Sequence, residues 1–254
     1  GVNITGSYNL INGSNVTGVR HDGVDIAGSD NTIYDSNVVG GWAGMYIAGS
    51  DNLIYDVNVT GEGFGGLGIA GSHNLIRDSA IVGRGFYGVS INGSDNVIRS
   101  SYVVGGAGYP GIGIVGDNST IYDVIVRGGY GIAIRGSDNT IYNSNATGYS
   151  YDGVYIWGNG NTVYGSRVVG NWSGVYIYGS YNLINGSNVT GNSYNGVYVL
   201  GNHTAIVRSY VTGYLSGINI TGNDNTIYGS RVVGNSDYGV YIYGNYNNVT
   251  DAFV

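Results

Sequence analysis

The chain of 254 residues contains no cysteine and no lysine, and it has one proline and one methionine. Without cysteine it forms neither disulfide bonds nor thiolate metal sites. All nine cations are scattered arginines and the net charge is −7, so no basic patch is available for nucleic-acid binding. Gly, Asn or Ser interrupts every uncharged run, and no segment is predicted to insert into a membrane.

Glycine and tyrosine, in contrast, are abundant, with 49 and 26 copies, and such biased usage indicates an internal repeat. An anchor glycine recurs at intervals of 20–23 residues, a period typical of solenoids. The anchors are Gly6, Gly28, Gly49, Gly71, Gly93, Gly116, Gly136, Gly158, Gly179, Gly201, Gly222 and Gly244.

Apolar residues occupy fixed positions relative to each anchor. An aliphatic residue follows five positions later and a second, broken only by Ala146, follows ten positions later. A glycine stands twelve positions after the anchor, and a G-φ-x-φ-x segment such as Gly23–Ile26 precedes the next anchor, where φ is apolar. Each period therefore predicts three short β-strands separated by glycine and polar turns.

Three short strands, each apolar on alternate residues, cannot bury a face alone, but equivalent strands stacked in parallel can. We therefore predict an all-β fold, a single-stranded parallel β-helix with coils about 4.8 Å apart. It has about twelve coils of 20–23 residues, with three short strands per coil, in one domain over 1–254 without evident caps.

Asparagine stands three residues after the anchor in ten of the twelve repeats. Stacked amides can hydrogen-bond along such a column, and asparagine tolerates a left-handed corner. We interpret this column as a structural ladder, and the serines eight residues after the anchor as a second, smaller one.

The segment GSDNTIYDSNVVG at Gly28–Gly40 and its relatives resemble the PbH1-type right-handed parallel β-helix repeats of the NosD-like and carbohydrate-binding/sugar-hydrolase families. The resemblance covers the whole chain and implies a right-handed solenoid. It is weak for activity, because members include pectinases, epimerases, phage tailspikes and surface proteins.

Pectinase-like members would carry G-H-G and R-x-K elements, and epimerase-like members would carry D-P-H. The chain has no lysine, its only proline is Pro110, and none of His21, His73 and His203 lies between glycines. One segment, Arg20–Asp25, combines a base, an acid and a cation, and we favour an ordinary charged loop there. We therefore predict no catalytic residue and no enzymatic activity.

Aspartates recur two and seven residues after the anchor. Calcium between Asp30 and Asp51 would relieve the repulsion of stacked carboxylates. Aspartate is also a common turn former, and we favour that interpretation, with no cofactor.

The two x residues of G-φ-x-φ-x are expected to face solvent. They are small in the early repeats and aromatic in the later ones, which indicates a binding surface for sugar rings or for another protein. We interpret a further tyrosine column, six residues after the anchor, as structural. The candidate aromatic face consists of Tyr155, Trp157, Tyr176, Tyr178, Tyr198, Tyr241 and Tyr243.

N-x-S/T sequons occur thirteen times, and most of them are expected to point outward. We predict N-glycosylation of a secreted chain. The candidate acceptors are Asn3, Asn12, Asn15, Asn58, Asn92, Asn118, Asn145, Asn171, Asn185, Asn188, Asn202, Asn219 and Asn248.

Without caps, a solenoid can stack head to tail into a filament. We therefore predict an extracellular or cell-surface structural subunit whose partners are further copies of itself and its glycans. The alternative is a carbohydrate-binding surface protein or adhesin that uses the aromatic face, and a polysaccharide-active enzyme comes third.

Overall fold

The computed structural model describes residues 1–254, which form strands and turns without any helix. It contains therefore no helix that is long and apolar enough to cross a membrane. The chain divides into two compact units, unit 1 (1–129) and unit 2 (130–254). Each unit is a parallel β-solenoid, and the single domain over 1–254 stays a prediction.

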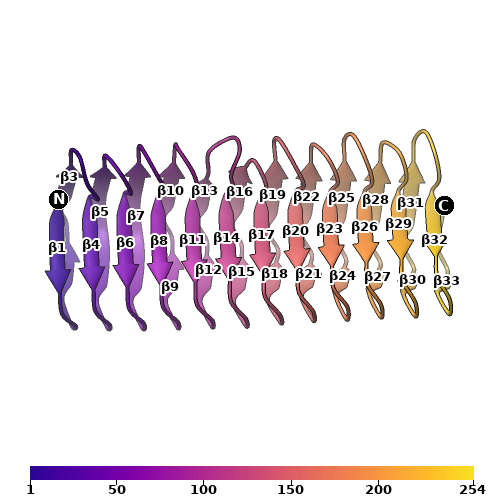
Figure 1. Ribbon diagram of the computed structural model, residues 1–254, viewed down its shortest axis with the longest axis horizontal. Coiled ribbons are helices and arrows are strands. Elements are labelled where there is room, and N and C mark those ends of the chain that lie inside the picture. The colour runs from indigo at the N-terminus through magenta and orange to yellow at the C-terminus, as the bar shows by residue number, and fades with distance from the viewer. The chain divides into compact units, whose positions relative to one another are not determined.

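In unit 1, the G-φ-x-φ segments form a parallel sheet that we call sheet A. Its strands pair in strict register, so that Val24 lies beside Val2 on one side and beside Met45 on the other. Figure 1 shows these strands as a row of parallel arrows. They are β1 (Val2–Thr5), β4 (Val24–Ala27), β6 (Met45–Ala48), β8 (Leu67–Ala70), β11 (Val89–Asn92) and β14 (Ile112–Val115).

The other strands of unit 1 contain the two remaining apolar columns. In two repeats they merge into nine-residue strands, which still turn a corner at Asp35 and Asp56, with φ of 48° and 52°. These strands are β2 (Leu10–Asn12), β3 (Asn15–Gly18), β5 (Thr32–Gly40), β7 (Leu53–Gly61), β9 (Leu75–Arg77), β10 (Ala80–Gly83), β12 (Val97–Arg99), β13 (Tyr102–Val104), β15 (Thr120–Tyr122) and β16 (Ile125–Gly128).

Unit 2 repeats this plan, and six of its strands belong to sheet A. Its strands are β17 (Ile132–Arg135), β20 (Val154–Trp157), β23 (Val175–Tyr178), β26 (Val197–Leu200), β29 (Ile218–Thr221) and β32 (Val240–Tyr243). The other strands are β18 (Thr140–Tyr142), β19 (Asn145–Gly148), β21 (Thr162–Tyr164), β22 (Arg167–Gly170), β24 (Leu183–Asn185), β25 (Asn188–Gly191), β27 (Ala205–Val207), β28 (Tyr210–Gly213), β30 (Thr226–Tyr228), β31 (Arg231–Gly234) and β33 (Asn248–Thr250).

The core of each unit consists of the predicted apolar columns. Ile26, Ile33 and Val38 of one turn are all at most 1% exposed, while their strand neighbours Ala27, Thr32, Tyr34 and Asn37 are exposed or half-buried. The glycine column closes the turn tightly. A side chain at Gly40 would place its Cβ against the carbonyl oxygen of Ala43, so only glycine fits there. The predicted fold class, with three short strand segments per turn, is therefore confirmed.

The predicted asparagine ladder is also present. The buried amide of Asn31 donates to Oδ1 of Asn52 over 3.0 Å, and that of Asn52 donates to Oδ1 of Asn74 over 3.0 Å. The same oxygens accept from backbone N–H groups, as when Asn31 N donates to Asn52 Oδ1 over 2.9 Å. The ladder therefore satisfies buried main-chain donors at the corners of successive turns.

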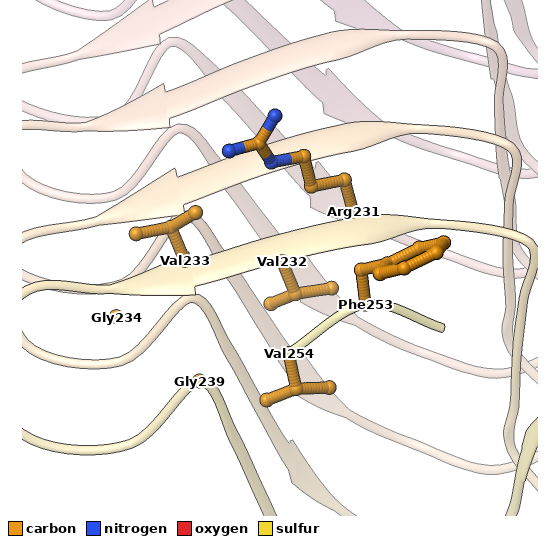
Figure 2. A pocket seen from close by; sticks show the side chains of 7 residues that line it. All are labelled: Arg231, Val232, Val233, Gly234, Gly239, Phe253 and Val254. Atoms are coloured by element: carbon orange, nitrogen blue, oxygen red, sulfur yellow. The ribbon is translucent and has the colours of Figure 1, made fainter. Parts of the chain in front are cut away.

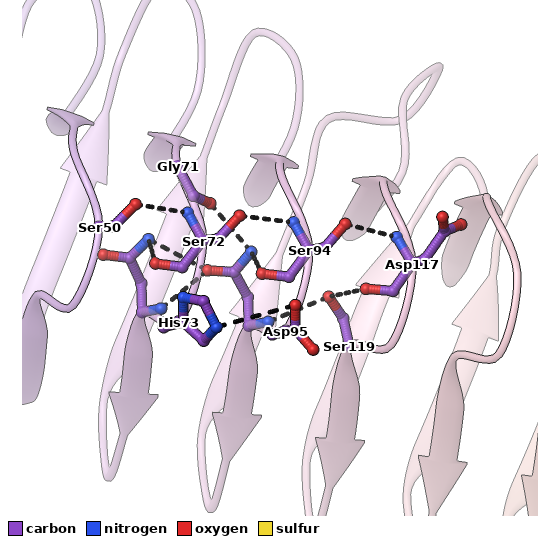
Figure 3. Close-up of polar contacts among 10 residues, drawn as sticks. Ser50, Gly71, Ser72, His73, Ser94, Asp95, Asp117 and Ser119 are labelled. Carbon is purple, nitrogen blue, oxygen red and sulfur yellow. Dashed lines mark hydrogen bonds and ion pairs between the residues drawn. The ribbon is translucent and has the colours of Figure 1, made fainter.

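Serines form two further ladders. In one, the hydroxyls of the serines eight residues after the anchor accept from the next main chain, as when Ser14 N donates to Ser36 Oγ over 3.1 Å. The other lies directly after the anchors, where Ser72 N donates to Ser50 Oγ and Ser94 N to Ser72 Oγ, each over 3.0 Å (Figure 3). Serine hydroxyls thus hydrogen-bond the corner of one turn to the corner of the neighbouring turn.

The left-handed corner residue is not the asparagine that we expected. It is the residue just before it, as at Asp30 (φ 56°), Asp51 (φ 57°) and His73 (φ 58°). Aspartate tolerates this conformation better than most residues, because its short side chain can hydrogen-bond locally. The aspartate columns therefore mark corners of the main chain, in agreement with their interpretation as turn formers.

We expect Asn52→Ala to lower the free energy of unfolding by about 2–4 kcal/mol, because it leaves the buried N–H and amide of Asn31 unpaired. A matched control is Asn37→Ala, since the exposed amide of Asn37 donates to Asn15 Oδ1 over 3.0 Å in full contact with water. The control is expected to cost less than about 0.5 kcal/mol. Urea denaturation measures both, and equal losses would contradict a stabilising role of the buried ladder.

Candidate functional site

Aromatic rings gather on the outer face of sheet A in unit 2. Tyr155, Tyr176 and Tyr198 occupy the same strand position on three successive turns. The ring centroids of Tyr155 and Tyr176 are 5.4 Å apart and the planes differ by 19°, so each ring covers part of its neighbour's face. Tyr198 is 5.1 Å from Tyr176 and is tilted by 58°. All three rings of this inner row are half-buried.

An outer row runs beside it, two residues further along each strand. Trp157 and Tyr178 are each about half exposed, at 50% and 51%. Their centroids are 5.8 Å apart with the planes at 78°, so the two rings do not hide each other face to face. The guanidinium of Arg135 lies 5.7 Å from the Trp157 ring. We call Tyr155, Trp157, Tyr176, Tyr178 and Tyr198 the aromatic strip.

The loops that lead into sheet A add a third row, which the sequence analysis missed. Tyr130 stacks on Tyr151 at 4.6 Å, Tyr151 meets the edge of Trp172 at 5.1 Å, and Trp172 lies 6.0 Å from Tyr194. Tyr130 also contacts Tyr155 of the strip, with centroids 5.8 Å apart. These loops differ in length, so no column aligns there. The sequence could have indicated this third row, because each of these loops contains at least one aromatic residue.

Asp152 lies at the base of this loop row, directly before β20. Its side chain is 5% exposed, and Oδ1 accepts a hydrogen bond from the backbone N–H of Ser173 over 2.9 Å. Burial raises the pKa of the Asp152 carboxyl from 3.8 to about 6, and the Ser173 hydrogen bond lowers it only in part. A carboxyl group that loses its proton near pH 6 therefore lies close to Tyr130 and Tyr176.

The surroundings of Asp152 also change the pKa of two tyrosine phenols, Tyr130 and Tyr176. Burial raises the pKa of the Tyr130 phenol, and the Asp152 carboxylate raises it further, while Arg135 acts in the opposite direction. Burial likewise raises the pKa of the Tyr176 phenol, with smaller contributions from Tyr198 and Tyr155. Both phenols therefore stay protonated and can donate hydrogen bonds at neutral pH.

The two remaining members of the predicted aromatic face lie apart from the strip. Tyr241 and Tyr243 of β32 are in register with Asn219 and Thr221 of β29, and these pair in turn with Tyr198 and Leu200. One turn without a ring, at Asn219, interrupts the inner row, and two turns, at Leu200 and Thr221, interrupt the outer row. Tyr241 instead contacts Tyr238 of its own turn, with centroids 5.5 Å apart.

The segment Arg20–Asp25 contributes to a different hollow, in unit 1. His21, Asp22 and Asp25 line a hollow of about 390 Å³ together with Gly1, Val2 and Asn3. Asp22 uses Oδ1 to accept the N–H of Ala43 over 2.8 Å, the same capping contact that Asp152 makes in unit 2. This contact gives Asp22 a structural role in the turn.

A hollow of about 650 Å³ lies beside the last turns of unit 2 (Figure 2). Figure 2 shows Val232 and Val254 on successive turns, with Gly234 and Gly239 nearby and Arg231 as the charged member of the lining. Val232 is 1% exposed and belongs to the apolar column ten residues after the anchor. The hollow is therefore lined by members of the apolar core column, Val232 and Val254. We assign no ligand site to it.

Asp30 and Asp51, the weak calcium candidates, are left-handed corner residues on successive turns. No group of three or more His, Cys, Asp or Glu side chains gathers in a metal-binding arrangement. The nearest acidic contact of a histidine is His73 Nε2 with Asp95 Oδ2 at 3.9 Å, between two exposed corners (Figure 3). Calcium binding between Asp30 and Asp51 stays an untested alternative.

The sequon asparagines differ in accessibility. Four of them are half-buried, namely Asn145, Asn185, Asn202 and Asn219, and the other nine are exposed. Oδ1 of Asn202 accepts the N–H of Asn223 over 2.7 Å, and Oδ1 of Asn145 is buried without a partner. N-glycosylation stays a prediction, and the structure favours the nine exposed sites.

Comparison with protein families identifies the class. Two matches to the family described as right handed beta helix region cover residues 1–145 and 110–251. The chain therefore belongs to the right-handed β-helix family, as its resemblance to PbH1-type repeats implied. No curated protein sequence matches the chain significantly.

Solved structures with the same fold include the A-module of the Azotobacter vinelandii mannuronan C-5 epimerase AlgE4. It is 13% identical with a TM-score of 0.67, over 99% of this chain and 87% of the epimerase module. The Dettilon tailspike protein is 13% identical with a TM-score of 0.60, over 95% of this chain and 61% of the tailspike. A GH87 alpha-1,3-glucanase catalytic domain in complex with nigerose is 12% identical with a TM-score of 0.53, over 99% and 64% of the two chains.

These relatives overturn the predicted role as a structural filament subunit. The proteins that share the fold are named as an epimerase, a glucanase and a tailspike. The filament prediction rested on the absence of evident caps alone, and none of these proteins is named as a filament subunit. The prediction of no enzymatic activity is weakened too, because the fold is shared with polysaccharide-modifying enzymes.

The raised pKa of Asp152 predicts how stability depends on pH. The folded chain holds the proton up to about pH 6, whereas the unfolded chain releases it near 3.8, so stability falls as pH rises through this window. Asp152→Asn keeps an acceptor for Ser173 and removes the charge. We expect the variant to be more stable than wild type at about pH 7.5, by at most about 3 kcal/mol, and equal to it at about pH 3.5.

Thermal unfolding at both pH values measures this difference. Asp22→Asn is the matched control, because Asp22 makes the same contact with Ala43 while half-exposed, where solvent screens its charge. The control is expected to change stability much less at pH 7.5. An Asp152→Asn variant that is destabilised equally at both pH values would show that the carboxylate is not buried as described.

Proposed function

We propose that this protein binds a polysaccharide along the aromatic strip of unit 2. The observation that carries the proposal is the pair of in-register aromatic rows, in which Trp157 and Tyr178 keep half of their surface exposed. Sugar rings pack their apolar C–H faces on such rings, and aromatic residues with a polar tip are suited to amphipathic ligands.

The strip combines apolar and polar groups at a spacing that suits a chain ligand. Successive turns of a parallel solenoid are about 4.8 Å apart, comparable to the length of one sugar unit in an extended chain. Tyr155, Tyr176 and Tyr198 offer one phenol hydroxyl per turn, so neighbouring sugar units can meet equivalent hydrogen-bonding groups. Arg135 beside Trp157 adds a cation that can pair with a uronate.

The names of the structural relatives support the choice of ligand. The epimerase is named for mannuronan and the glucanase for an alpha-1,3-glucan, and both are therefore proteins that handle polysaccharides. At 12–13% identity these likenesses establish the fold, and the ligand class is our proposal. A polysaccharide ligand and a fold shared with a tailspike also support an extracellular or cell-surface location.

We propose binding rather than cleavage as the main activity. Glycoside hydrolysis by the usual routes takes two carboxyl groups, one on each side of the scissile bond. The strip is bordered by one carboxyl group, Asp152, which is buried and already caps Ser173. Its raised pKa nevertheless matches that of a general acid, and this feature keeps an enzymatic activity as the second candidate.

We expect Trp157→Ala and Tyr178→Ala to weaken polysaccharide binding at least about tenfold each, because every lost ring removes a stacking surface. Affinity electrophoresis in gels that contain a mannuronan, an alpha-1,3-glucan or a beta-1,4-glucan measures the retention. Tyr164→Ala is the matched control, since Tyr164 is 43% exposed and stacked on Tyr142 in another part of the same unit. The control is expected to keep full retention.

Retention by none of the polysaccharides, or equal losses in all three variants, would contradict the proposal. The same polysaccharides, incubated with the protein and sized by gel filtration, test the second candidate. Chain shortening that Asp152→Asn abolishes would favour the enzyme, because that change keeps the cap on Ser173 and removes only the titratable proton.

A further inference from the structure

Sheet A of unit 1 contains a slot where the outward row of side chains is interrupted. Gly68 of β8 stands between Tyr46 of β6 and Ser90 of β11 in the same row. A Cβ at Gly68 would lie 2.9 Å from Cδ2 of Tyr46, so the tyrosine ring leans over the glycine. The missing side chain at Gly68 makes room for the Tyr46 ring, and the slot lies beside that ring.

Aromatic rings form the walls of this slot. Phe64, from the loop before β8, stacks between Trp42 and Phe86 with centroid distances of 5.3 Å and 5.0 Å. Tyr87, from the next loop, leans onto Gly113, where a Cβ would lie 2.9 Å from Cε1 of the ring. Tyr46, Phe64 and Tyr87 all line the slot, and these ring contacts hold its walls in place.

The slot has the size of a single six-membered ring. Its volume is about 150 Å³, and Ala70 lines it beside Gly68. An apolar cavity of about 150 Å³ accommodates a benzene molecule. The slot is thus large enough for one pyranose ring and too small for two.

Polar groups at the rim are available to a ligand. Ser90 and Asn92 of β11 both line the slot, and no hydrogen bond within the protein uses the Ser90 hydroxyl or the Asn92 side-chain amide. All the residues that line the slot are uncharged. An apolar floor with a few unused hydrogen-bonding groups is typical of small-molecule sites, and neutral walls favour a neutral ligand.

We infer that this slot binds one neutral pyranose unit, either free or as part of a glycan. The aromatic walls pack against the C–H face of the ring, and Ser90 and Asn92 bond to its hydroxyls. The inference shares its ligand class with the proposed function, but its residues all belong to unit 1. It specifies neutral sugars there, whereas the strip in unit 2 carries Arg135.

Ala70→Phe tests the slot, because the new ring fills the space from a position that points away from the core. Ala27→Phe is the matched control, since Ala27 occupies the same row two turns earlier and does not line the slot. Equal thermal midpoints of the two variants show that both are folded. The full chain is produced without N-glycans, because Asn92 also heads a sequon.

Saturation-transfer NMR with methyl glucoside, methyl galactoside and sodium glucuronate measures binding. We expect transfer to at least one methyl glycoside and weaker transfer to glucuronate. Ala70→Phe should reduce affinity for the glycoside at least about tenfold, while Ala27→Phe leaves it unchanged. No transfer to either glycoside, or equal transfer in Ala70→Phe and Ala27→Phe, would overturn the inference. Loss of the signal in Trp157→Ala would also overturn it and would assign sugar binding to the strip alone.

Discussion

Pairing between equivalent residues one turn apart is the constraint on which this structure depends. Every strand bonds to the same strand of the neighbouring turn, and the corners bond in the same way through Asn31, Asn52 and Asn74. Because buried polar groups must be paired, a shift of one residue in any turn would leave main-chain donors unsatisfied and turn apolar side chains outward. Register is therefore strongly specified in both units.

The same register organises the surface. A residue type that recurs at an outward position becomes a row, as with Tyr155, Tyr176 and Tyr198. Rings in such a row cover one another, which stabilises the turns but reduces the area left for a ligand. Binding surface is gained where the repetition fails, as at the perpendicular pair of Trp157 and Tyr178 or at Gly68 between Tyr46 and Ser90.

Periodicity in the sequence predicted the fold because each column corresponds to one physical requirement. The apolar columns became the buried residues Ile26, Ile33 and Val38, and the glycine column became the tight closure at Gly40. The corner conformation was assigned to the wrong residue, because asparagine and aspartate both tolerate left-handed backbone and stand next to each other at Asp30 and Asn31.

The site was predicted in part. Five of the seven expected aromatic residues form the strip, and Asn219 and Thr221 separate the other two from it. Tyr151, Trp172 and Asp152 were missed because they lie in loops of unequal length, where periodicity carries no information. Asp152 bonds to the main chain of the next turn at Ser173, and the slot beside Gly68 depends on the leaning of Tyr46. Neither feature is encoded in a single repeat.

The central claim is that a polysaccharide lies on the aromatic strip of unit 2. Chemical-shift mapping of the full chain with oligosaccharides of the polysaccharide that it retains tests this claim most directly. The account predicts that the indole N–H of Trp157 and the backbone amides of β20, β23 and β26 shift together as the oligosaccharide is added. Shifts confined to residues outside these strands and the loops before them would contradict it.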